Sequence, residues 1–398
     1  MRVLLVTGTG GSGSTTVAAA TAAGAAAAGH KTLVLSLAAP RSLGQVLGSP
    51  LGTTPTELDA GLFALHADVE DAYGRVWDTA RRQLPTVLER AGAAAFTSAT
   101  VPALPLADPL LTLLALQEQV CAAGWDVVVV DCPPAAATLR LLAVPEALRW
   151  YADRLFPLEH RALRAVRPLL ARRSGPALPP EQVLTVLEQA LVRLDGLRAV
   201  LTGAASSVRL VLTPEAGALA ETRRATTALA LAGHRLDALV VNRLLPASTD
   251  PFVAGWRASQ QEQLAELRRL AGPVPVLELA HHGAGPVGQA ALAALGCPLE
   301  MPDAEAAPDP SPTVSRTVDG FELSLPLPGA SSDTVQLARS GDELVLTCAG
   351  SRRLLALPGA LRRCTVTRAR LSGGRLSVRF EPDPDLWPTA AGAGRAWA

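Results

Sequence analysis

A glycine-rich stretch near the N-terminus is the part of the chain whose residue types point most directly to chemistry. It reads GTGGSGSTT, and it lies between the apolar run Val3–Val6 and an alanine-rich segment that reaches Ala28. This order predicts a buried strand, a tight turn and a helix, a setting in which backbone N–H groups and the positive end of a helix dipole bind phosphate. The residues expected to form this phosphate cradle are Gly8, Gly10, Gly11, Ser12, Gly13, Ser14, Thr15 and Thr16.

The cation that normally accompanies such a loop is missing. A phosphate-binding loop usually carries a lysine just before its hydroxyl residues, because the ammonium group neutralises the β- and γ-phosphates. Here Ser14 precedes Thr15 and Thr16, and Lys31, the only lysine in the chain, lies beyond the following helix. The sequence therefore predicts a cradle that is shaped for phosphate but lacks its positive charge.

Strands and helices alternate through the first three quarters of the chain. After the first strand, further buried strands are expected at 32–37, 62–67, 127–130, 208–212, 238–241 and 274–279. Helices are expected between them, at 14–28, 71–92, 110–123, 215–233 and 260–270, with a loop at 93–108. This rhythm is typical of an α/β fold, a doubly wound and mostly parallel sheet with its sites at the carboxyl ends of the strands. We assign residues 1–297 to this domain, with helical subdomain segments at about 71–123 and 139–203.

The last quarter of the chain has a different pattern. Residues 298–312 are acidic and rich in proline, which predicts a linker. From 313 to 382 apolar and polar residues alternate with period two between turn signals, which predicts a small all-β sandwich. Residues 383–398 are expected to be a disordered tail.

Amino-acid composition limits which partners, metals and cellular compartments are expected for this protein. The chain has 398 residues, and its 36 basic residues balance 36 acidic ones, so no overall field attracts nucleic acid. Five scattered cysteines form no CxxC pair, which disfavours a zinc site, a disulfide framework or a thiolate triad for arsenite. No apolar stretch reaches the roughly 18 residues that span a bilayer. We therefore expect a cytoplasmic protein without zinc, nucleic-acid partner or transmembrane segment.

Several motifs, taken in order, resemble the ArsA ATPases, a family that covers arsenite-pump ATPases and the ATPases that target tail-anchored membrane proteins. Besides the glycine loop, they are SLAAPRSL at Ser36–Leu43, the strand and switch at Val127–Trp150, and VVNRLLP at Val240–Pro246. The ending Ala369-x-Leu371-x-x-Gly374-x-Leu376 resembles an α-crystallin (small heat-shock protein) domain. The resemblance implies a P-loop NTPase fold, a homodimer, and ATP or ADP bound with Mg²⁺.

The chain departs from the family pattern at the residues that carry out phosphoryl transfer in the family. Thr9 and Ser14 stand where the family loop GKGGVGKTT has its two lysines, and Ala38 replaces the aspartate that handles the attacking water. In the switch DTAPTGHT the aspartate survives as Asp131, while the glycine and histidine do not. The resemblance implies that Thr15 is the magnesium ligand, that Asp131 supports the magnesium from behind this ligand, and that Asn242 recognises adenine.

These losses leave more than one function open. Phosphoryl transfer depends on charge neutralisation and positioning, so two missing lysines and a missing aspartate predict a rate lower by about 10⁶-fold or more. The loop then either binds ATP or ADP with Mg²⁺ weakly or only turns the chain. We expect a hydrolysis-deficient pseudo-ATPase that binds hydrophobic clients or a partner protein between its helical subdomains. One alternative is an ATPase for anion transport or tail-anchored-protein targeting, with an arginine such as Arg41 supplying charge. The other is a regulatory subunit in a heterodimer with an active paralogue.

Overall fold

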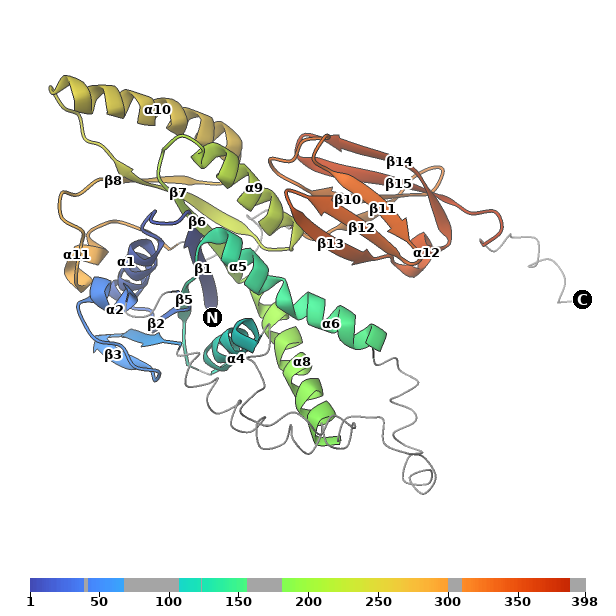
Figure 1. The fold of residues 1–398 in the computed structure, drawn as a ribbon, viewed down its shortest axis with the longest axis horizontal. Helices are drawn as coiled ribbons and strands as arrows, with labels where there is room; N and C mark the ends of the chain where they lie inside the picture. The colour runs from blue at the N-terminus through green and yellow to red at the C-terminus, as the bar shows by residue number, and fades with distance from the viewer. Residues whose placement is uncertain (39–41, 68–106, 123, 156–180, 300–309, 387–398) are drawn as a thin grey trace, which may run out of the picture. The chain divides into compact units, whose positions relative to one another are not determined.

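The structure, a computed structural model, describes residues 1–38, 42–67, 107–122, 124–155, 181–299 and 310–386 (Figure 1). The helix predicted at 71–92, most of the loop predicted after it, Arg41 and most of the predicted linker lie outside the described residues. The chain forms two compact units, each of which we describe by itself. The loop residues Gly8–Ser12 group with the second unit, and the residues from Gly13 onward group with the first.

The first unit is built on parallel strands whose residues are almost all apolar and buried. Its described elements are β1 (Arg2–Gly8), α1 (Ser14–Ala27), β2 (Thr32–Ser36), α2 (Ser42–Leu47), β3 (Thr56–Asp59), β4 (Leu62–His66), α4 (Ala107–Cys121), β5 (Val127–Asp131), α5 (Ala135–Leu142), α6 (Val144–Leu155), α8 (Glu181–Leu201) and α11 (Gln289–Ala293). Strands β2, β4, β5 and β1 are parallel, and β3 joins β4 in the antiparallel sense. Every residue of β1, β2 and β5 is buried, as expected for strands covered on both faces.

Strand register in the first unit places the candidate site. Val6 of β1 and Ser36 of β2 both pair with Asp131, the last residue of β5. The carboxyl ends of these three strands therefore meet at one edge of the sheet, next to the point where α1 begins. Because α1 is made mainly of alanine, it packs closely on this sheet, and most of its side chains are buried.

The second unit holds the rest of the parallel strands and the strand-rich C-terminal part. Its described elements are β6 (Ser206–Leu212), α9 (Ala218–Leu231), β7 (Leu236–Leu244), α10 (Pro251–Ala271), β8 (Val276–Ala280), β9 (Thr313–Arg316), β10 (Phe321–Pro326), β11 (Gln336–Ser340), β12 (Glu343–Cys348), β13 (Ser351–Ala356), α12 (Gly359–Arg362), β14 (Cys364–Ser372) and β15 (Arg375–Pro382). Strand β7 is parallel to both β6 and β8, and the eight-stranded order is β3-β4-β2-β5-β1-β6-β7-β8. The mostly parallel α/β sheet that the sequence predicts is confirmed.

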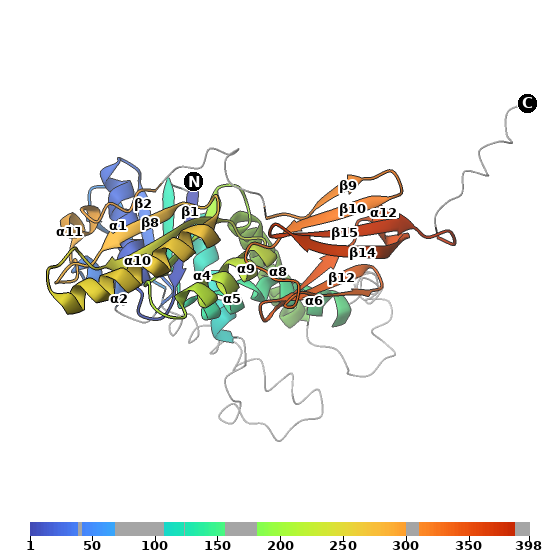
Figure 2. The same ribbon diagram turned by 90° about the horizontal axis from the view of Figure 1, so that it is seen from above.

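The C-terminal strands form two antiparallel sheets, as the period-two pattern predicts. One has the order β14-β15-β10-β9 and the other the order β11-β12-β13. Their inward side chains, among them Leu325, Leu346 and Phe380, form one hydrophobic core. Helix α9 contributes Leu231 to this core and contacts β12 and β13 (Figure 1). Figure 2 shows β9, β10, β15 and β14 of one sheet side by side, with β12 of the other sheet apart from them. The Thr227 hydroxyl also donates to the carbonyl of Pro328 at 2.7 Å, so α9 and the sandwich are packed together.

Several element boundaries differ from the sequence-based expectation. Helix α10 begins at Pro251, not near Gln260. Asp250 caps the helix, because its carboxylate accepts hydrogen bonds from the N–H groups of Phe252 and Val253, each at 3.0 Å. Proline also suits the first position of a helix. Residues 107 and 108, expected in a loop, begin α4. The segment expected to be helical at 139–203 contains α6 and α8, with 156–180 outside the described residues.

The C-terminal end of the described chain is a short turn. Leu386 donates its N–H to the carbonyl of Asp383 at 3.1 Å, so residues 383–386 of the predicted tail have a hydrogen-bonded conformation. The rest of that predicted tail lies outside the described residues. Within the described ranges, no helix combines the length and the apolar character needed to cross a bilayer.

Candidate functional site

The glycine loop has the backbone shape that a phosphate cradle requires. Gly11 and Gly13 have φ of 76° and 91°, the left-handed region that glycine occupies without steric cost. Ser12 donates its N–H to the carbonyl of Thr9 at 3.1 Å, which tightens the turn. A Cβ at Gly8 would lie 2.1 Å from the carbonyl oxygen of Val211, whereas a Cβ at Gly10 would meet nothing within 4 Å. The loop is therefore packed at its base and open at its tip.

The start of α1 offers hydrogen-bond donors to an anion. Gly13 stands at the N-cap and supplies no side-chain acceptor to the first turn, whose N–H groups are left for another partner. Ser14, Thr15 and Thr16 are half-buried. Ser12 is buried, and its hydroxyl has no hydrogen-bond partner within the described part of the chain. A buried hydroxyl without a partner costs free energy, so its presence in the loop fits a site that accepts a ligand.

Asp131 is the charged group at the carboxyl ends of the first unit's strands. Its side chain is fully buried; the hydroxyl of Ser36 donates to Oδ2 at 2.9 Å, and the hydroxyl of Thr15 donates to the same carboxylate. Burial raises the pKa of Asp131 from 3.8 to about 6, and the two hydroxyl hydrogen bonds offset only part of this rise. Among the residues that the structure describes, Oδ1 has no hydrogen-bond partner. A hydroxyl and a carboxylate together fit Mg²⁺, a hard cation that takes oxygen ligands, so Thr15 and Asp131 are the residues that would hold it.

Asn242 is hydrogen-bonded to the loop of its own unit. Its amide Nδ2 donates to the carbonyl of Ser12 at 2.8 Å, and its Oδ1 accepts from the N–H of Arg243 at 2.8 Å. Arg243 has φ of 61°, which is uncommon outside glycine, and buried Gln260 holds this conformation by donating to its carbonyl at 3.1 Å. Asn242 thus anchors the second-unit half of the loop to the end of β7.

Lys31 lies at the amino end of β2, whereas the loop follows the carboxyl end of β1. Its ammonium nitrogen is 5.0 Å from the ring centroid of Trp125 and 5.4 Å from that of Phe63, and the two rings contact each other edge to face. These are cation–π distances. The single lysine of the chain therefore has a structural environment of its own and does not take the place of the lysine missing at Ser14.

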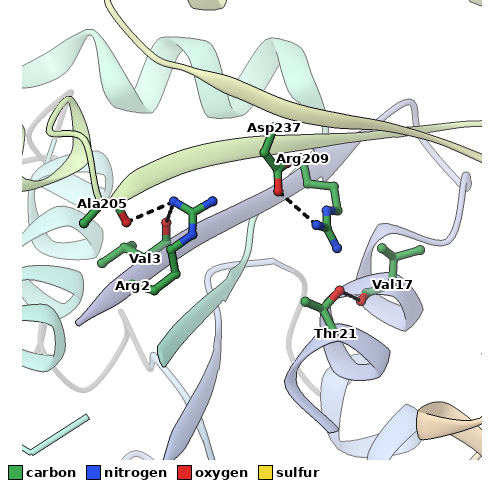
Figure 3. Close-up of polar contacts among 7 residues, drawn as sticks. All are labelled: Arg2, Val3, Val17, Thr21, Ala205, Arg209 and Asp237. Carbon is green, nitrogen blue, oxygen red and sulfur yellow. Dashed lines mark hydrogen bonds and ion pairs between the residues drawn. The ribbon is translucent and has the colours of Figure 1, made fainter. Parts of the chain in front are cut away.

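Two buried arginines also have protein partners (Figure 3). In the first unit, Arg2 donates to the carbonyl of Ala205 at 3.0 Å. In the second unit, Arg209 pairs with Asp237 at 2.9 Å, and its side chain is only 3% exposed. Asp237 compensates the buried charge of Arg209. Removing Asp237 would leave that charge without a counter-ion, which is strongly destabilising.

Sequence reasoning missed two residues that organise the site. Ser36 holds Asp131, and Gln260 holds the turn at Arg243 while accepting from the N–H of Leu245 at 2.9 Å. Ser36 could have been found, because it ends a strand of the sheet just as Asp131 does. Gln260 could not, since only the packing of α10 on β7 brings it to that turn.

Cys132 follows Asp131 directly but has no catalytic character. It is buried, and burial raises its pKa further above the ordinary thiol value, with the Asp131 carboxylate adding to the rise. A protonated thiol is a poor nucleophile and a poor metal ligand. Of the other four cysteines, Cys121 is exposed and the rest are buried.

The sheet, the glycine loop at the end of its first strand and the helix that follows define a P-loop NTPase-like fold. Comparison with known proteins names the family: residues 1–299 match the anion-transporting ATPases of the ArsA type, and residues 318–380 match the HSP20-like domain found in ArsA. The chain belongs to the ArsA family. The resemblance that the sequence motifs indicate is confirmed for both parts.

Relatives match along nearly the whole chain. An uncharacterized protein of Streptomyces coelicolor is 41% identical over 98% of this chain and 99% of its own length. A protein of Mycobacterium tuberculosis is 32% identical over 98% of each chain. A Chlorobaculum tepidum protein named "Putative arsenical pump-driving ATPase" is 29% identical over 91% of each chain.

Proposed function

We propose that this ArsA-family protein is a hydrolysis-deficient pseudo-ATPase whose fold holds a hydrophobic client segment or a partner protein. The observation that carries the proposal is the position of Lys31. The one lysine of the chain is at the amino end of β2, with its ammonium group over the rings of Phe63 and Trp125, while Ser14 occupies the lysine position of the loop. Without that ammonium group, charge that develops on a transferring phosphate is not neutralised by the loop.

The residue at the water-handling position supports the same conclusion. Ala38 follows the end of β2, and its backbone N–H donates to the hydroxyl of Ser36 at 3.2 Å. Its methyl side chain can neither orient a water molecule nor accept a proton. Loss of a general base alone costs roughly 10²- to 10⁴-fold in rate.

Nucleotide binding is a separate part of the proposal. The left-handed glycines, the uncapped start of α1, and the Thr15–Asp131 pair favour weak binding of ATP or ADP with Mg²⁺ over an empty turn. Asn242 would recognise adenine through the amide hydrogen and the oxygen lone pair that its bonds to Ser12 and Arg243 leave over.

The client-binding part rests on the helices of the first unit. Helices α6 and α8 are joined by ion pairs between Arg149 and Asp195 and between Arg198 and Glu146, the second at 2.9 Å. Beside these pairs, Tyr151 and Val192 are 54% and 70% exposed. Exposed apolar side chains on a braced helix pair favour an apolar partner. We propose a homodimer, or a heterodimer with a paralogue, as the form that presents these helices.

A second candidate is a working ATPase, which the name of the Chlorobaculum tepidum relative favours. It would drive anion transport or membrane-protein targeting. A cation from elsewhere, such as Arg41 or a residue of a partner subunit, would then have to complete the site.

Calorimetric titration with ATP and ADP in the presence of Mg²⁺ tests the proposal, together with steady-state ATP turnover. Three proteins are compared: the wild type, Ser14→Lys, and Ser14→Ala as the control that removes the hydroxyl without adding charge. We expect weak binding and no turnover by the wild type, and a gain in affinity of tenfold or more for Ser14→Lys only, because one charge-assisted contact contributes roughly 1.5–3 kcal/mol. Turnover by the wild type at the rate of an ordinary ATPase would refute the proposal.

Binding of a labelled apolar helical peptide, followed by fluorescence polarisation, tests the client-binding part. We expect Tyr151→Glu to weaken binding, because it places a charge on the exposed apolar part of α6. The matched control is Phe252→Glu, the same change at an aromatic residue of α10 that is 75% exposed. Equal affinity of the wild type and Tyr151→Glu would contradict a client site on α6.

A further inference from the structure

The outer face of the sheet β14-β15-β10-β9 carries a cavity lined by charged and hydroxyl side chains. Its volume is about 290 Å³, and it is lined by four arginines, two serines and one glutamate. The arginines are Arg368, Arg370, Arg375 and Arg379, and the glutamate is Glu322. We call these five charged residues and the surface between them the arginine face.

The arginine face does not serve the core of its own domain. Along β15, Leu376, Val378 and Phe380 point inward and are at most 3% exposed. Arg375 and Arg379 occupy the alternate positions, on the opposite side of the sheet, and both are exposed. The guanidinium groups therefore stand in solvent, where a ligand can reach them.

Pairing in the sheet brings like charges together. Arg368 lies directly opposite Arg379 in the antiparallel register of β14 and β15. Like charges that face each other across a strand pair are destabilising. Glu322 pairs with Arg379 at 3.6 Å and, among the described residues, with no other arginine; Arg375 donates to the hydroxyl of Ser324 at 3.0 Å. Four guanidinium groups against one carboxylate leave three positive charges, and no ion pair of Arg368 or Arg370 occurs within the described ranges.

The spacing of these charges matches an extended peptide. Arg368 and Arg370 are two residues apart on one strand, so their positions are separated by roughly 6–7 Å, the distance between alternate side chains of any extended chain. Guanidinium groups pair with carboxylates through two parallel hydrogen bonds. A segment with carboxylates at alternate positions can therefore pair with successive arginines of β14.

The same face is poorly suited to nucleic acid. Single-stranded nucleic acids are held by aromatic side chains that stack on the bases, and none of the residues that line the cavity is aromatic. Glu322 would also repel a phosphate backbone. We propose that the arginine face binds an extended acidic segment of a partner polypeptide, one that carries glutamate or aspartate at alternate positions. The proposal is independent of nucleotide binding, since it concerns only the strand-rich part of the second unit.

Fluorescence polarisation with the full-length protein tests the proposal. The probe is a labelled twelve-residue peptide in which glutamate alternates with threonine, and its control is a peptide of the same composition with all glutamates in one block. We compare the wild type with Arg368→Gln/Arg370→Gln and with Arg316→Gln/Arg352→Gln, a matched pair that removes two exposed arginines from other positions of the same domain. Because the first double variant removes two exposed ion pairs with the peptide, it should weaken binding of the alternating peptide by roughly tenfold.

The outcomes distinguish specific binding at the arginine face from general electrostatic attraction of an acidic peptide to positive charge. Tighter binding of the alternating peptide than of the block peptide, a loss confined to Arg368→Gln/Arg370→Gln, and weakening by added salt would support the proposal. Equal losses in both double variants would overturn it, because they would show attraction to any positive charge. A single-stranded oligonucleotide that binds more tightly than the peptide would overturn the choice of a polypeptide.

Thermal unfolding of the same proteins excludes a purely structural role. Removing Arg368 relieves the repulsion from Arg379, so the midpoint of Arg368→Gln/Arg370→Gln should be unchanged or higher. A lower midpoint would mean that the arginines stabilise the fold, and it would overturn the proposal.

Discussion

Replacing Asp131 by asparagine removes a carboxylate that the fold buries with one oxygen unpartnered. Burial raises the pKa of this group from 3.8 to about 6, so the folded protein binds the proton more tightly than the unfolded chain does. Between these two pKa values the folded state carries more protons, and the free energy of unfolding therefore falls as pH rises. Asparagine stays neutral, and its oxygen can still accept from Ser36. The free energy of unfolding of Asp131→Asn should therefore not fall as pH rises through this range.

The magnitude follows from the two pKa values. At about 1.36 kcal/mol for each tenfold change in proton affinity, they correspond to roughly 3 kcal/mol of stability lost when the folded carboxylate is fully ionised. About 2 kcal/mol of this loss falls between about pH 4.5 and about pH 7.5. Urea unfolding at both pH values, followed by tryptophan fluorescence, measures it, because Trp125 lies just before β5 and reports on this sheet. We expect Asp131→Asn to be the more stable protein at the higher pH, by a margin that widens by about 2 kcal/mol.

A margin that does not change with pH would refute this reasoning, because it would show that Asp131 ionises equally well in the folded and unfolded states. The magnesium role adds a second arm to the experiment. If Thr15 and Asp131 hold Mg²⁺ next to a bound nucleotide, Mg²⁺ with ADP should stabilise the wild type more than Asp131→Asn. Equal stabilisation of the two proteins would contradict that role.

Three further substitutions probe the loop, the lysine and the sandwich. Gly8→Ala should lower the free energy of unfolding by about 1–3 kcal/mol, measured by urea denaturation, because its Cβ would overlap the carbonyl of Val211; an unchanged midpoint would contradict this. Lys31→Gln should cost only about 0.5–1 kcal/mol by the same measurement, and nucleotide affinity in calorimetry should not change; a loss of affinity would give Lys31 a role at the loop. Leu231→Ala should cost about 2–5 kcal/mol and speed hydrogen exchange in β12 and β13, because Leu231 completes the core of the sandwich; unchanged exchange there would refute that packing.

Much of the fold can be predicted from local pattern alone. Runs of buried branched residues such as Val127–Val130 identify central strands, and alternation such as Leu323–Ser324–Leu325 identifies the sandwich. Boundaries that depend on capping are harder to predict. Apolar periodicity alone places the start of α10 too late, although Asp250 and Pro251 carry a recognisable capping signal. The short β3 and α2 escape prediction because four to six residues give too little periodicity to detect.

For the candidate site as well, the sequence identifies several residues, whereas their contacts depend on the tertiary structure. Gly11 and Gly13 belong to the loop because of their type, and the positive φ at each agrees with it. The sequence also names Asp131 and Asn242, but not what they contact. That Ser36 and Thr15 share the carboxylate, and that Asn242 donates to Ser12, follows from strand register and helix packing.

The amino-acid sequence by itself determined which chemical groups this protein has: a glycine loop, one lysine, and serine and alanine where a lysine and an aspartate are expected. Those facts hold whatever the fold is, because a group that is not encoded cannot be supplied by packing. Only the tertiary structure decided what surrounds each group. It stacks Lys31 on two aromatic rings, buries Asp131 so that its pKa rises, and sets Arg368 opposite Arg379. These environments depend on contacts between residues far apart in the chain, which strand register and side-chain packing create.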